Sequence, residues 1–341
     1  MKKKVSLKDI ATAAGVSTAL VSYVLTNKEE QARVGKEMAK KIRQIARKLN
    51  YQPNHIARSL KSGRSFTIGL VVADISNPFF ASIARTIEDE AKRNNYTVIF
   101  GSSDENADKS ADLINVLLNR QVDGLIITPT DGAEQQIKQL QERKVPFVLI
   151  DRYFPGIRSN NISINNYESA YTAVAHLIKN GRQRVGMIAY NTTMHHINER
   201  KRGYTEAMRD KKLLQKNSLL KLARYAQIKE DVRLAIDELR RHRTPPDALF
   251  FATNSLALEG LKYLTELGIR IPDELAVVSF DEGEAFDLFY SPVTFVRQPI
   301  LDMGKASVRL LLEQITDGKK DIEHIQIDTE LVIRKSCGSK Q

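Results

Sequence analysis

The chain has 341 residues, of which 42% are hydrophobic, a formal net charge of +11 and a single cysteine, Cys337. This length exceeds the roughly 150 residues of a typical domain, and the apolar content is enough for a core in each of two or three domains. A lone cysteine excludes an internal disulfide framework and fits a reducing compartment. No stretch approaches the roughly 20 apolar residues that span a bilayer, so we expect a cytoplasmic protein without a membrane partner.

The net charge lies entirely in the amino-terminal segment. Residues 1–65 carry 15 Lys and Arg against 4 Asp and Glu, whereas residues 66–341 carry 37 of each kind. A basic excess confined to one part of a chain is typical of a nucleic-acid-binding module. The sequence therefore predicts a cationic head that reads DNA, joined to a neutral body with a different task.

Three short helices are predicted in the basic segment. Ser6 can cap a helix that ends at Gly15, and Ser17 can cap a second helix over 18–25. An amphipathic third helix covers roughly 36–49. Two short helices that meet across a glycine turn, closed by a third, are typical of a helix-turn-helix unit.

The second helix supplies the candidate base contacts, because in such a unit it lies in the major groove with its amino-terminal side chains at base edges. The candidates are Ser17, Thr18, Ala19 and the outward-facing Tyr23. In the turn before the third helix, we expect Arg33 to reach DNA.

Residues 53–65 form a linker with a helical pattern at 55–60. Isolated helices below about 12 residues are marginal in water, so this segment needs a partner or DNA in order to fold.

Beyond residue 66, apolar runs rich in Val and Ile alternate with amphipathic helical patterns. The runs are 67–73, 96–101, 124–128, 147–151, 184–189, 248–253 and 275–280. Such runs predict parallel strands that are buried on both faces, which makes the body an α/β protein. Both a pair of doubly wound lobes and a closed barrel are compatible with this alternation.

Polar and aromatic side chains follow these runs. Open α/β sheets bind ligands outside the carboxyl ends of their strands. The candidates placed there are Asn77, Phe79, Asp151, Arg152, Asn254 and Asp281. Carboxylate, amide and guanidinium groups beside an aromatic face suit a polyol such as a sugar. We expect the neighbouring Phe80 to lie in the core.

Several separated motifs carry a family resemblance. Ala14-Gly15-Val16-Ser17, 49–54, Ala57-Arg58-Ser59-Leu60, 76–80 and Arg297-Gln298-Pro299 occur in one order along the chain. With these motifs the whole chain resembles the lactose/galactose repressor family.

The resemblance implies further DNA contacts. They are Ser6, Ser22, Asn54, His55, Ala57 and Leu60. Ala57 and Leu60 would belong to a hinge helix that orders on operator DNA, with two copies of Leu60 wedged into the minor groove. The family usually has arginine where this chain has Tyr23, and a phenol cannot make arginine's forked contact with guanine. We therefore expect a different operator base there.

For the body, the resemblance implies two doubly wound lobes of the periplasmic-binding-protein type that exchange strands, and a homodimer. The expected parts are a headpiece over 1–52, a hinge and linker over 53–65, and an effector-binding domain over 66–338, with one lobe at 66–163 and 293–325 and the other at 164–292 and 326–338. Arg200, three residues before Gly203, joins the effector contacts. Asn254 is followed by Ser255 where many members have Asp, which alters the usual sugar-hydroxyl pattern.

Enzyme functions are disfavoured by the motifs. No G-x-G-x-x-G follows the first run, no phosphate-binding G-x-x-x-x-G-K-[ST] occurs, and His195 and His196 lack the spacing of a helical zinc pair. We expect no catalytic residue, metal or cofactor. The sequence predicts a ligand-controlled repressor of transcription that binds a pseudo-palindromic operator. The alternative is a cytoplasmic sugar-binding or sugar-processing protein whose head docks on nucleic acid without specificity.

Overall fold

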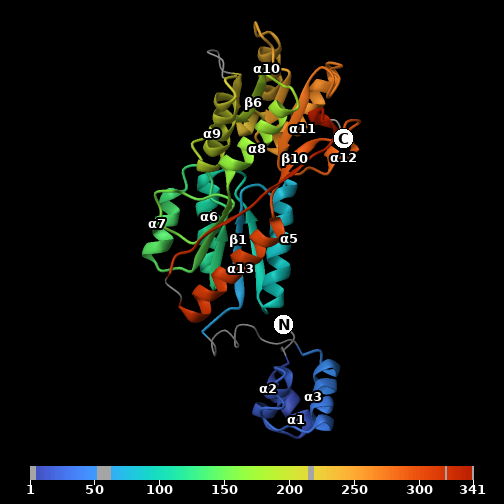
Figure 1. The fold of residues 1–341 in the computed structure, drawn as a ribbon. Helices are drawn as coiled ribbons and strands as arrows, with labels where there is room; N and C mark the ends of the chain where they lie inside the picture. The colour runs from blue at the N-terminus through green and yellow to red at the C-terminus, as the bar shows by residue number, and fades with distance from the viewer. Residues whose placement is uncertain (1–4, 52–62, 214–218, 319–320, 340–341) are drawn as a thin grey trace. The chain divides into compact units, whose positions relative to one another are not determined.

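Residues 5–51, 63–213, 219–318 and 321–339 are described by the computed structural model, in which the chain forms two units, Met1–Ser65 and Phe66–Gln341 (Figure 1). The first unit, the head, is helical in its described residues, and the second, the body, contains two six-stranded sheets. This confirms the predicted fold class. No helix in the described ranges is long and apolar enough to cross a membrane.

The head consists of α1 (Leu7–Ala14), α2 (Thr18–Leu25) and α3 (Lys36–Lys48). Ser6 caps α1 through a reciprocal capping box, and Gly15 ends it in the left-handed conformation (φ 72°), which glycine adopts without steric cost. The apolar stripes of the three helices meet in a small core. Its buried members are Ile10, Ala11, Ala14, Val21, Val24, Ala39, Ile42 and Ala46.

The first lobe of the body is built on a parallel sheet with the order β11-β5-β4-β3-β1-β2. Its strands are β1 (Thr67–Val72), β2 (Thr97–Ser102), β3 (Gly124–Ile127), β4 (Phe147–Ile150), β5 (Asn161–Ile164) and β11 (His324–Ile327). Its helices are α5 (Pro78–Arg93), α6 (Ala107–Asn119), α7 (Glu134–Glu142) and α13 (Ile300–Asp317). Although α13 comes late in the sequence, it packs beside α5 (Figure 1).

The second lobe has the sheet order β12-β10-β9-β8-β6-β7, with only β12 antiparallel among the described strands. Its strands are β6 (Val185–Tyr190), β7 (Leu220–Ala223), β8 (Ala248–Phe251), β9 (Ala276–Phe280), β10 (Thr294–Arg297) and β12 (Glu330–Val332). Its α-helices are α8 (Asn166–Lys179), α9 (His195–Asp210), α10 (Ile228–Arg240), α11 (Asn254–Glu266) and α12 (Ala285–Leu288), with short 3-10 turns η1 (Tyr225–Gln227) and η2 (Lys335–Cys337).

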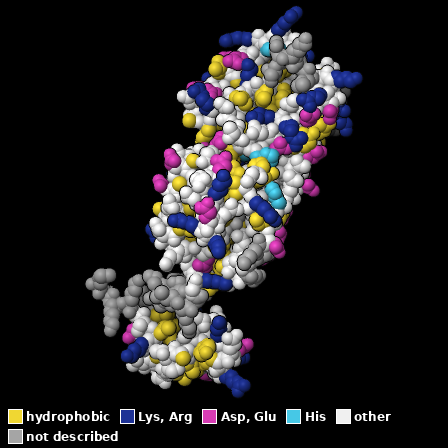
Figure 2. Space-filling view, turned by 90° about the vertical axis from the view of Figure 1, so that its left-hand side faces the viewer, with side chains coloured by type: hydrophobic (Ala, Val, Ile, Leu, Met, Phe, Trp, Pro, Cys, Tyr) yellow, Lys and Arg dark blue, Asp and Glu magenta, His cyan; other side chains and the backbone are white. Residues whose placement is uncertain are grey.

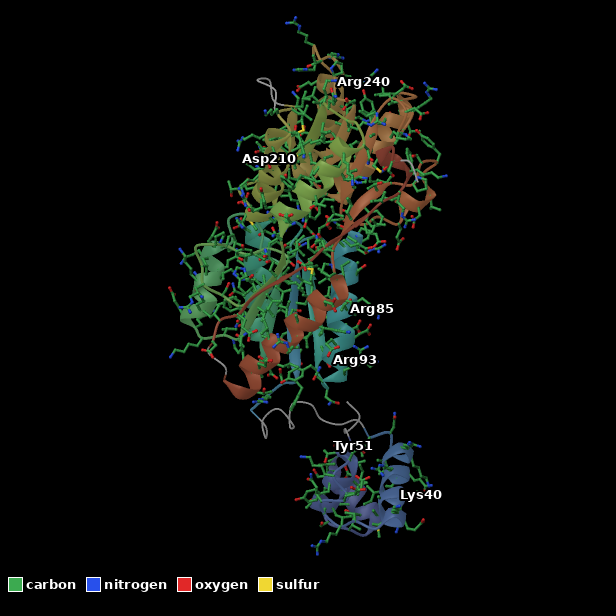
Figure 3. The ribbon with its side chains drawn as sticks, viewed as in Figure 1. Lys40, Tyr51, Arg85, Arg93, Asp210 and Arg240 are labelled. Carbon is green, nitrogen blue, oxygen red and sulfur yellow. The ribbon has the colours of Figure 1, made fainter. Side chains whose placement is uncertain are left out.

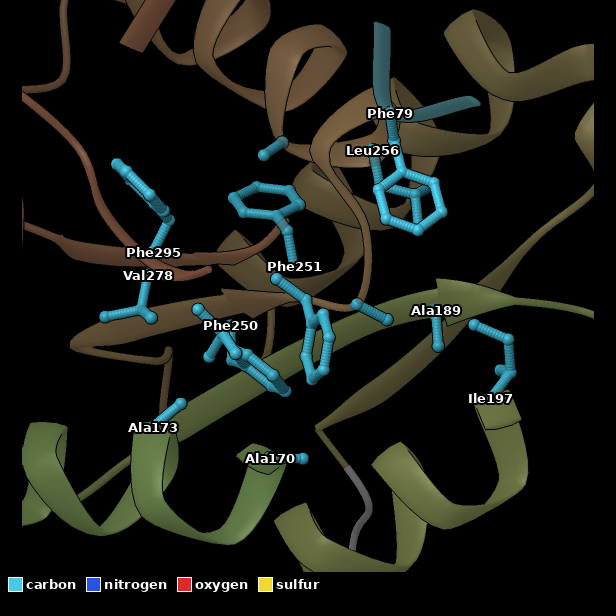
Figure 4. Packing of buried hydrophobic residues seen from close by; sticks show 14 of the residues in the cluster. Phe79, Ala170, Ala173, Ala189, Ile197, Phe250, Phe251, Leu256, Val278 and Phe295 are labelled. Atoms are coloured by element: carbon cyan, nitrogen blue, oxygen red, sulfur yellow. The ribbon is translucent and has the colours of Figure 1, made fainter. Parts of the chain in front are cut away.

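The core of the second lobe is continuous with apolar residues of the first. Phe250, Phe251 and Val278 of its central strands share one cluster with Phe79 of α5 (Figure 4). Helix α9 lies against α8 because Gly203 has no side chain: a Cβ there would lie 2.3 Å from the Tyr167 carbonyl oxygen. This close packing fixes the position of α9, which carries Arg200.

The lobe boundaries differ from the predicted ones at two crossings. Segment 293–325 was expected in the first lobe, but its first strand, β10, pairs with β9, Thr294 beside Val278. The chain crosses after β10, where Gln298 and Pro299 precede α13. Segment 326–338 was expected in the second lobe, but Gln326 and Ile327 complete β11 in the first sheet. The second error arises because β11 is a short strand at a sheet edge with a weak apolar signal. The first error places the crossing before β10 instead of after it, although β10 lies inside its sheet between β12 and β9.

Candidate functional site

One face of α2 is open to solvent. Ser17 caps the helix, its hydroxyl oxygen accepting from the Leu20 amide at 3.2 Å, while Thr18 and Ala19 are exposed. Ser22 is half-buried, and Tyr23 is 44% exposed. These positions recur at helical spacing, so that all of them could contact one DNA groove at the same time. The structure thus brings the predicted base contacts onto one face.

Other predicted contacts of the head lie elsewhere. The exposed Ser6 uses its hydroxyl to donate to the Asp9 carboxylate at 2.7 Å. Arg33 is exposed, with a left-handed backbone (φ 52°). The remaining four predicted contacts fall outside the described residues. They are Asn54, His55, Ala57 and Leu60.

The basic side of α3 is less free than the sequence indicates. Arg43 pairs with Glu29 and donates to the carbonyl of Val24 at 3.3 Å, which ties α3 to α2. Lys41 donates to the carbonyl of Ala14 at 3.3 Å. Lys40, in contrast, lies on the exposed side of α3 (Figure 3). Part of the basic excess therefore stabilises the head, and the rest remains available to phosphate.

In the body, the predicted effector contacts converge where the carboxyl ends of the two sheets face each other. The cleft is lined by Asn77, Phe79, Asp151, Arg152, Arg200 and Asp281. Asn254, the seventh predicted contact, lies beside it and donates to Asn77 Oδ1 at 3.1 Å. The structure thus brings the residues predicted from strand ends together with Arg200, which the family resemblance implied.

Arg200 lies at the centre of this cleft with only 2% of its surface exposed. Its Nε donates to Asn166 Oδ1 at 2.8 Å and its Nη1 to the Ala252 carbonyl at 2.7 Å. Asp281 Oδ2 lies 3.6 Å from Nη1, and the guanidinium carbon lies 3.5 Å from the centre of the Phe280 ring. The Nε and Nη1 atoms and one face of the guanidinium are therefore held by its own lobe.

Two buried aspartates occupy equivalent places in the two lobes. Asp151 follows β4 and Asp281 follows β9, with φ angles of 68° and 67°. Burial raises the pKa of Asp151 to about 6, with Arg152 and Arg200 only partly offsetting it. Burial also raises the pKa of Asp281, against the opposing effect of Arg200. Perturbed carboxyl groups in a cleft are typical of binding sites.

Arg152 is engaged by its own lobe. Its two terminal nitrogens donate to the Glu105 carboxylate at 2.7 Å each, and its Nε lies 3.5 Å from Asp151 Oδ2. The forked pairing orients the guanidinium and occupies its strongest donors. Arg152 thus lies in the cleft, as predicted, with those donors already bound.

Direct contacts link the lobes around the cleft. The Asn77 and Asn254 side chains bond to each other, and Tyr225 donates to Asp74. On another side of the cleft, Asp131 of the first lobe accepts from the Thr192 and Thr193 hydroxyls at 2.7 and 2.6 Å. The lobes are therefore closed on each other, and a space of only about 30 Å³ remains within the cleft.

Several buried polar atoms in the cleft lack a partner. Among the described residues, Asp151 Oδ1, His196 Nδ1 and Gln298 Oε1 have no hydrogen bond. Burial, with Arg152 and Arg200 adding to it, lowers the pKa of His196 well below its ordinary value, so the ring is neutral. An unsatisfied buried polar atom costs about 1–3 kcal/mol, which a bound ligand can recover.

Sequence reasoning missed eight lining residues. They are Asp74, Phe80, Glu105, Tyr190, His196, Tyr225, Thr253 and Gln298. The expectation that Phe80 belongs to the core alone is incomplete, because this buried ring also lines the cleft, 5.5 Å below the Arg152 guanidinium. The strand-end rule identifies most of the others: Glu105 follows β2 and Tyr190 ends β6. His196 lies one helical turn before Arg200.

A second hollow lies beside the cleft. It measures about 360 Å³ and is lined by α7, residues 153–157, residues 193–195 and Asn198. Figure 2 shows histidine and apolar side chains gathered where the lobes meet, and Tyr153 lies between His195 and His324 with ring centres at 5.1 and 4.5 Å. No group of side chains suited to a metal ion occurs within the described ranges.

Comparison with known proteins agrees with both units. Residues 6–54 match the family described as bacterial regulatory proteins, lacI family, and residues 174–337 match a periplasmic binding protein-like domain. The transcriptional regulator RegA of Clostridium acetobutylicum is 33% identical over 97% of this chain and 99% of its own. The ribose operon repressor of Halalkalibacterium halodurans is 33% identical over 97% and 96%, respectively.

Among solved structures, the lac repressor dimer bound to operator and the anti-inducer ONPF superposes with a TM-score of 0.84 at 23% identity, covering 98% of this chain and 99% of its own. That likeness concerns the fold, whereas the relatives above match in sequence along both units. The chain belongs to the lacI family of bacterial regulatory proteins.

Proposed function

We propose that this regulator represses transcription by binding a pseudo-palindromic operator as a homodimer, and that an effector held between the two lobes of the body controls this binding. Base contacts come from Ser17, Thr18, Ala19, Ser22 and Tyr23. Effector contacts come from the cleft around Arg200, Asp151 and Asp281. The protein acts in the cytoplasm, where its DNA target is, and performs no catalysis.

The observation that carries the proposal is the cleft, whose buried polar atoms lack partners although the lobes around it are closed. A sugar-sized ligand needs far more than the remaining 30 Å³, so the lobes must separate to admit it. Separation breaks the Asn77–Asn254 and Asp131–Thr193 bonds. The effector therefore changes the lobe arrangement through its unequal affinity for the open and closed states.

The dimer surface that we propose lies along the β2 and β7 edges of the two sheets. Exposed apolar side chains gather there in both lobes: Ile99, Phe100 and Val116 on β2 and α6, and Leu222, Leu234 and Leu258 on β7, α10 and α11. Exposed apolar groups on both lobes favour burial against a second copy. A two-fold dimer presents two heads to two half-sites, which explains the expected operator symmetry.

Selection of bound duplexes from a random DNA pool, followed by footprinting with the full-length protein, tests this function. Discrete protection over an inverted repeat is the expected result. Uniform protection would favour the alternative, a sugar-binding protein whose head docks on nucleic acid without specificity. The same assay with Phe100→Asp tests the dimer surface, since a charge there should abolish cooperative binding to the two half-sites, with Asp89→Asn on α5 as an exposed control.

A further inference from the structure

We propose that Arg43 is a positioning residue for operator recognition: its guanidinium fixes the carboxyl end of α2 and the turn that follows, so that Tyr23 and Arg33 meet the DNA together. This inference rests on the proposed binding of an operator. It goes further by assigning the orientation of α2 to a side chain of α3.

The carboxyl end of α2 has no cation of its own. A helix ends with carbonyl groups that have no partner within it and with a partial negative charge, which a nearby cation stabilises. The last turn of α2 contains no basic residue. Arg43 supplies the cation from α3, because its Nη2 donates to the Val24 carbonyl oxygen at 3.3 Å. Tyr23 directly precedes Val24, so this bond holds the end of α2 that carries a predicted base contact.

The same nitrogen also holds the turn between α2 and α3. It lies 3.1 Å from Asn27 Oδ1 and 2.5 Å from a carboxylate oxygen of Glu29. Asn27 has a left-handed backbone (φ 56°), and the carbonyl oxygen of Glu29 accepts from the Val34 amide at 2.8 Å. Val34 follows Arg33 directly. The contacts of Arg43 therefore extend through the turn to the segment that presents Arg33.

Pairing with Glu29 makes Arg43 a poor phosphate contact. The Arg43 side chain donates a hydrogen bond that lowers the pKa of Glu29, so the carboxylate stays ionised and balances the guanidinium charge. The exposed Lys40, three residues earlier on α3, has no such partner among the described residues. Nε and Nη1 of Arg43 make no hydrogen bond within the described ranges, so a direct phosphate contact is the competing role that the experiment must separate.

Orientation matters more for base contacts than for phosphate contacts. A base contact needs a donor and an acceptor in line, whereas attraction to the phosphate backbone is long-ranged and carries no sequence information. Helix α2 has only 8 residues, with the Ser17 cap at one end and Arg43 at the other. Loss of the Arg43 bonds should therefore weaken binding to the operator and leave binding to an unrelated duplex nearly unchanged.

Fluorescence anisotropy on the full-length protein, with the selected operator and a random duplex over a range of salt, tests the inference. Arg43→Met keeps the reach of the side chain and removes the guanidinium. It should weaken operator binding about tenfold, without changing the slope of log affinity against log salt. The control Lys40→Met should weaken both duplexes alike and reduce the slope by about one. A slope reduced by about one in Arg43→Met, or an equal loss on both duplexes by the folded variant, overturns the inference.

A second pair of variants gives opposite signs and decides the question if Arg43→Met does not fold. Glu30 is the exposed neighbour of Glu29, and Glu30→Gln should raise affinity for both duplexes, because it removes a charge that repels DNA. Glu29→Gln removes the same charge but loosens Arg43, so operator affinity should fall about threefold. An operator affinity that stays equal or rises in Glu29→Gln overturns the inference alone. A wild-type protein that prefers no duplex overturns the operator function as well.

Discussion

The side chains that we propose as contacts are exposed in the head and buried in the body. On the head, Thr18, Ala19 and Tyr23 stand in water on one face of a helix. In the body, Arg200, Asp151 and Asp281 are buried before any ligand arrives, with Arg200 beside Asp281 and Asp151 beside Arg152. An exposed face can be altered one residue at a time, because little else depends on it. A buried charged cluster cannot be altered one residue at a time, because each charge is balanced by its neighbours in the cluster.

The largest expected effect is a difference in salt dependence between operator binding by the head and effector binding by the body. If six to ten phosphates are neutralised, operator affinity should fall by about 10³ to 10⁵ between 50 and 200 mM salt. Effector affinity should change little, because the cleft charges are buried and poorly screened. Fluorescence anisotropy and calorimetry measure the two. An operator affinity that is flat with salt would contradict DNA binding by the basic head.

Removing one member of the buried cluster should have the next largest effect. Arg200→Ala leaves the buried Asp281 without its ion-pair partner, so we expect the protein to lose about 3–5 kcal/mol of stability and all ligand-induced stabilisation. Urea unfolding and thermal shift measure these losses.

Arg202→Ala is the matched control for Arg200→Ala. This arginine lies two residues further along α9 and pairs with Glu199 on the exposed surface. Its loss should cost less than about 1 kcal/mol. Equal destabilisation by the two variants would show that the buried cluster has no special role.

The buried carboxyl group of Asp151 predicts a pH dependence. Its folded pKa of about 6 lies above its ordinary value of 3.8, so its contribution to stability is greatest below pH 4 and is lost as pH rises through 6. Asn cannot ionise. The free energy of unfolding of Asp151→Asn, relative to wild type, should therefore rise by about 3 kcal/mol from pH 4 to pH 8. A difference independent of pH would show that burial does not perturb this carboxyl group.

The smallest effect belongs to the head. Tyr23→Ala should weaken binding to the selected operator by about 1–3 kcal/mol and relax the sequence preference at one base pair of each half-site, without changing effector affinity. Gln44→Ala, on the exposed side of α3, serves as the control. A uniform loss of affinity for all sequences would instead make Tyr23 a backbone contact.

The sequence predicted what depends on local pattern. Caps at Ser6 and Ser17 and the long apolar strands such as β1 and β9 follow from nearest neighbours and periodicity. What it missed depends on partners distant in the chain. Strand β11, with polar His324 and Gln326 among its four residues, is a strand because it pairs with β5. The Glu105–Arg152 pairing, likewise, joins residues that only the fold brings together.

Asp151 and Asp281, each after the third strand in its sheet order and each with nearly the same left-handed backbone, show that the lobes repeat one plan. The repetition gives the cleft an approximate internal two-fold symmetry, in which each half contributes one acidic group. Neither half alone has a complete receptor. Effector affinity should therefore depend on the angle between the two lobes. A mutation that alters this angle should change the affinity even when the mutated residue lies far from the cleft.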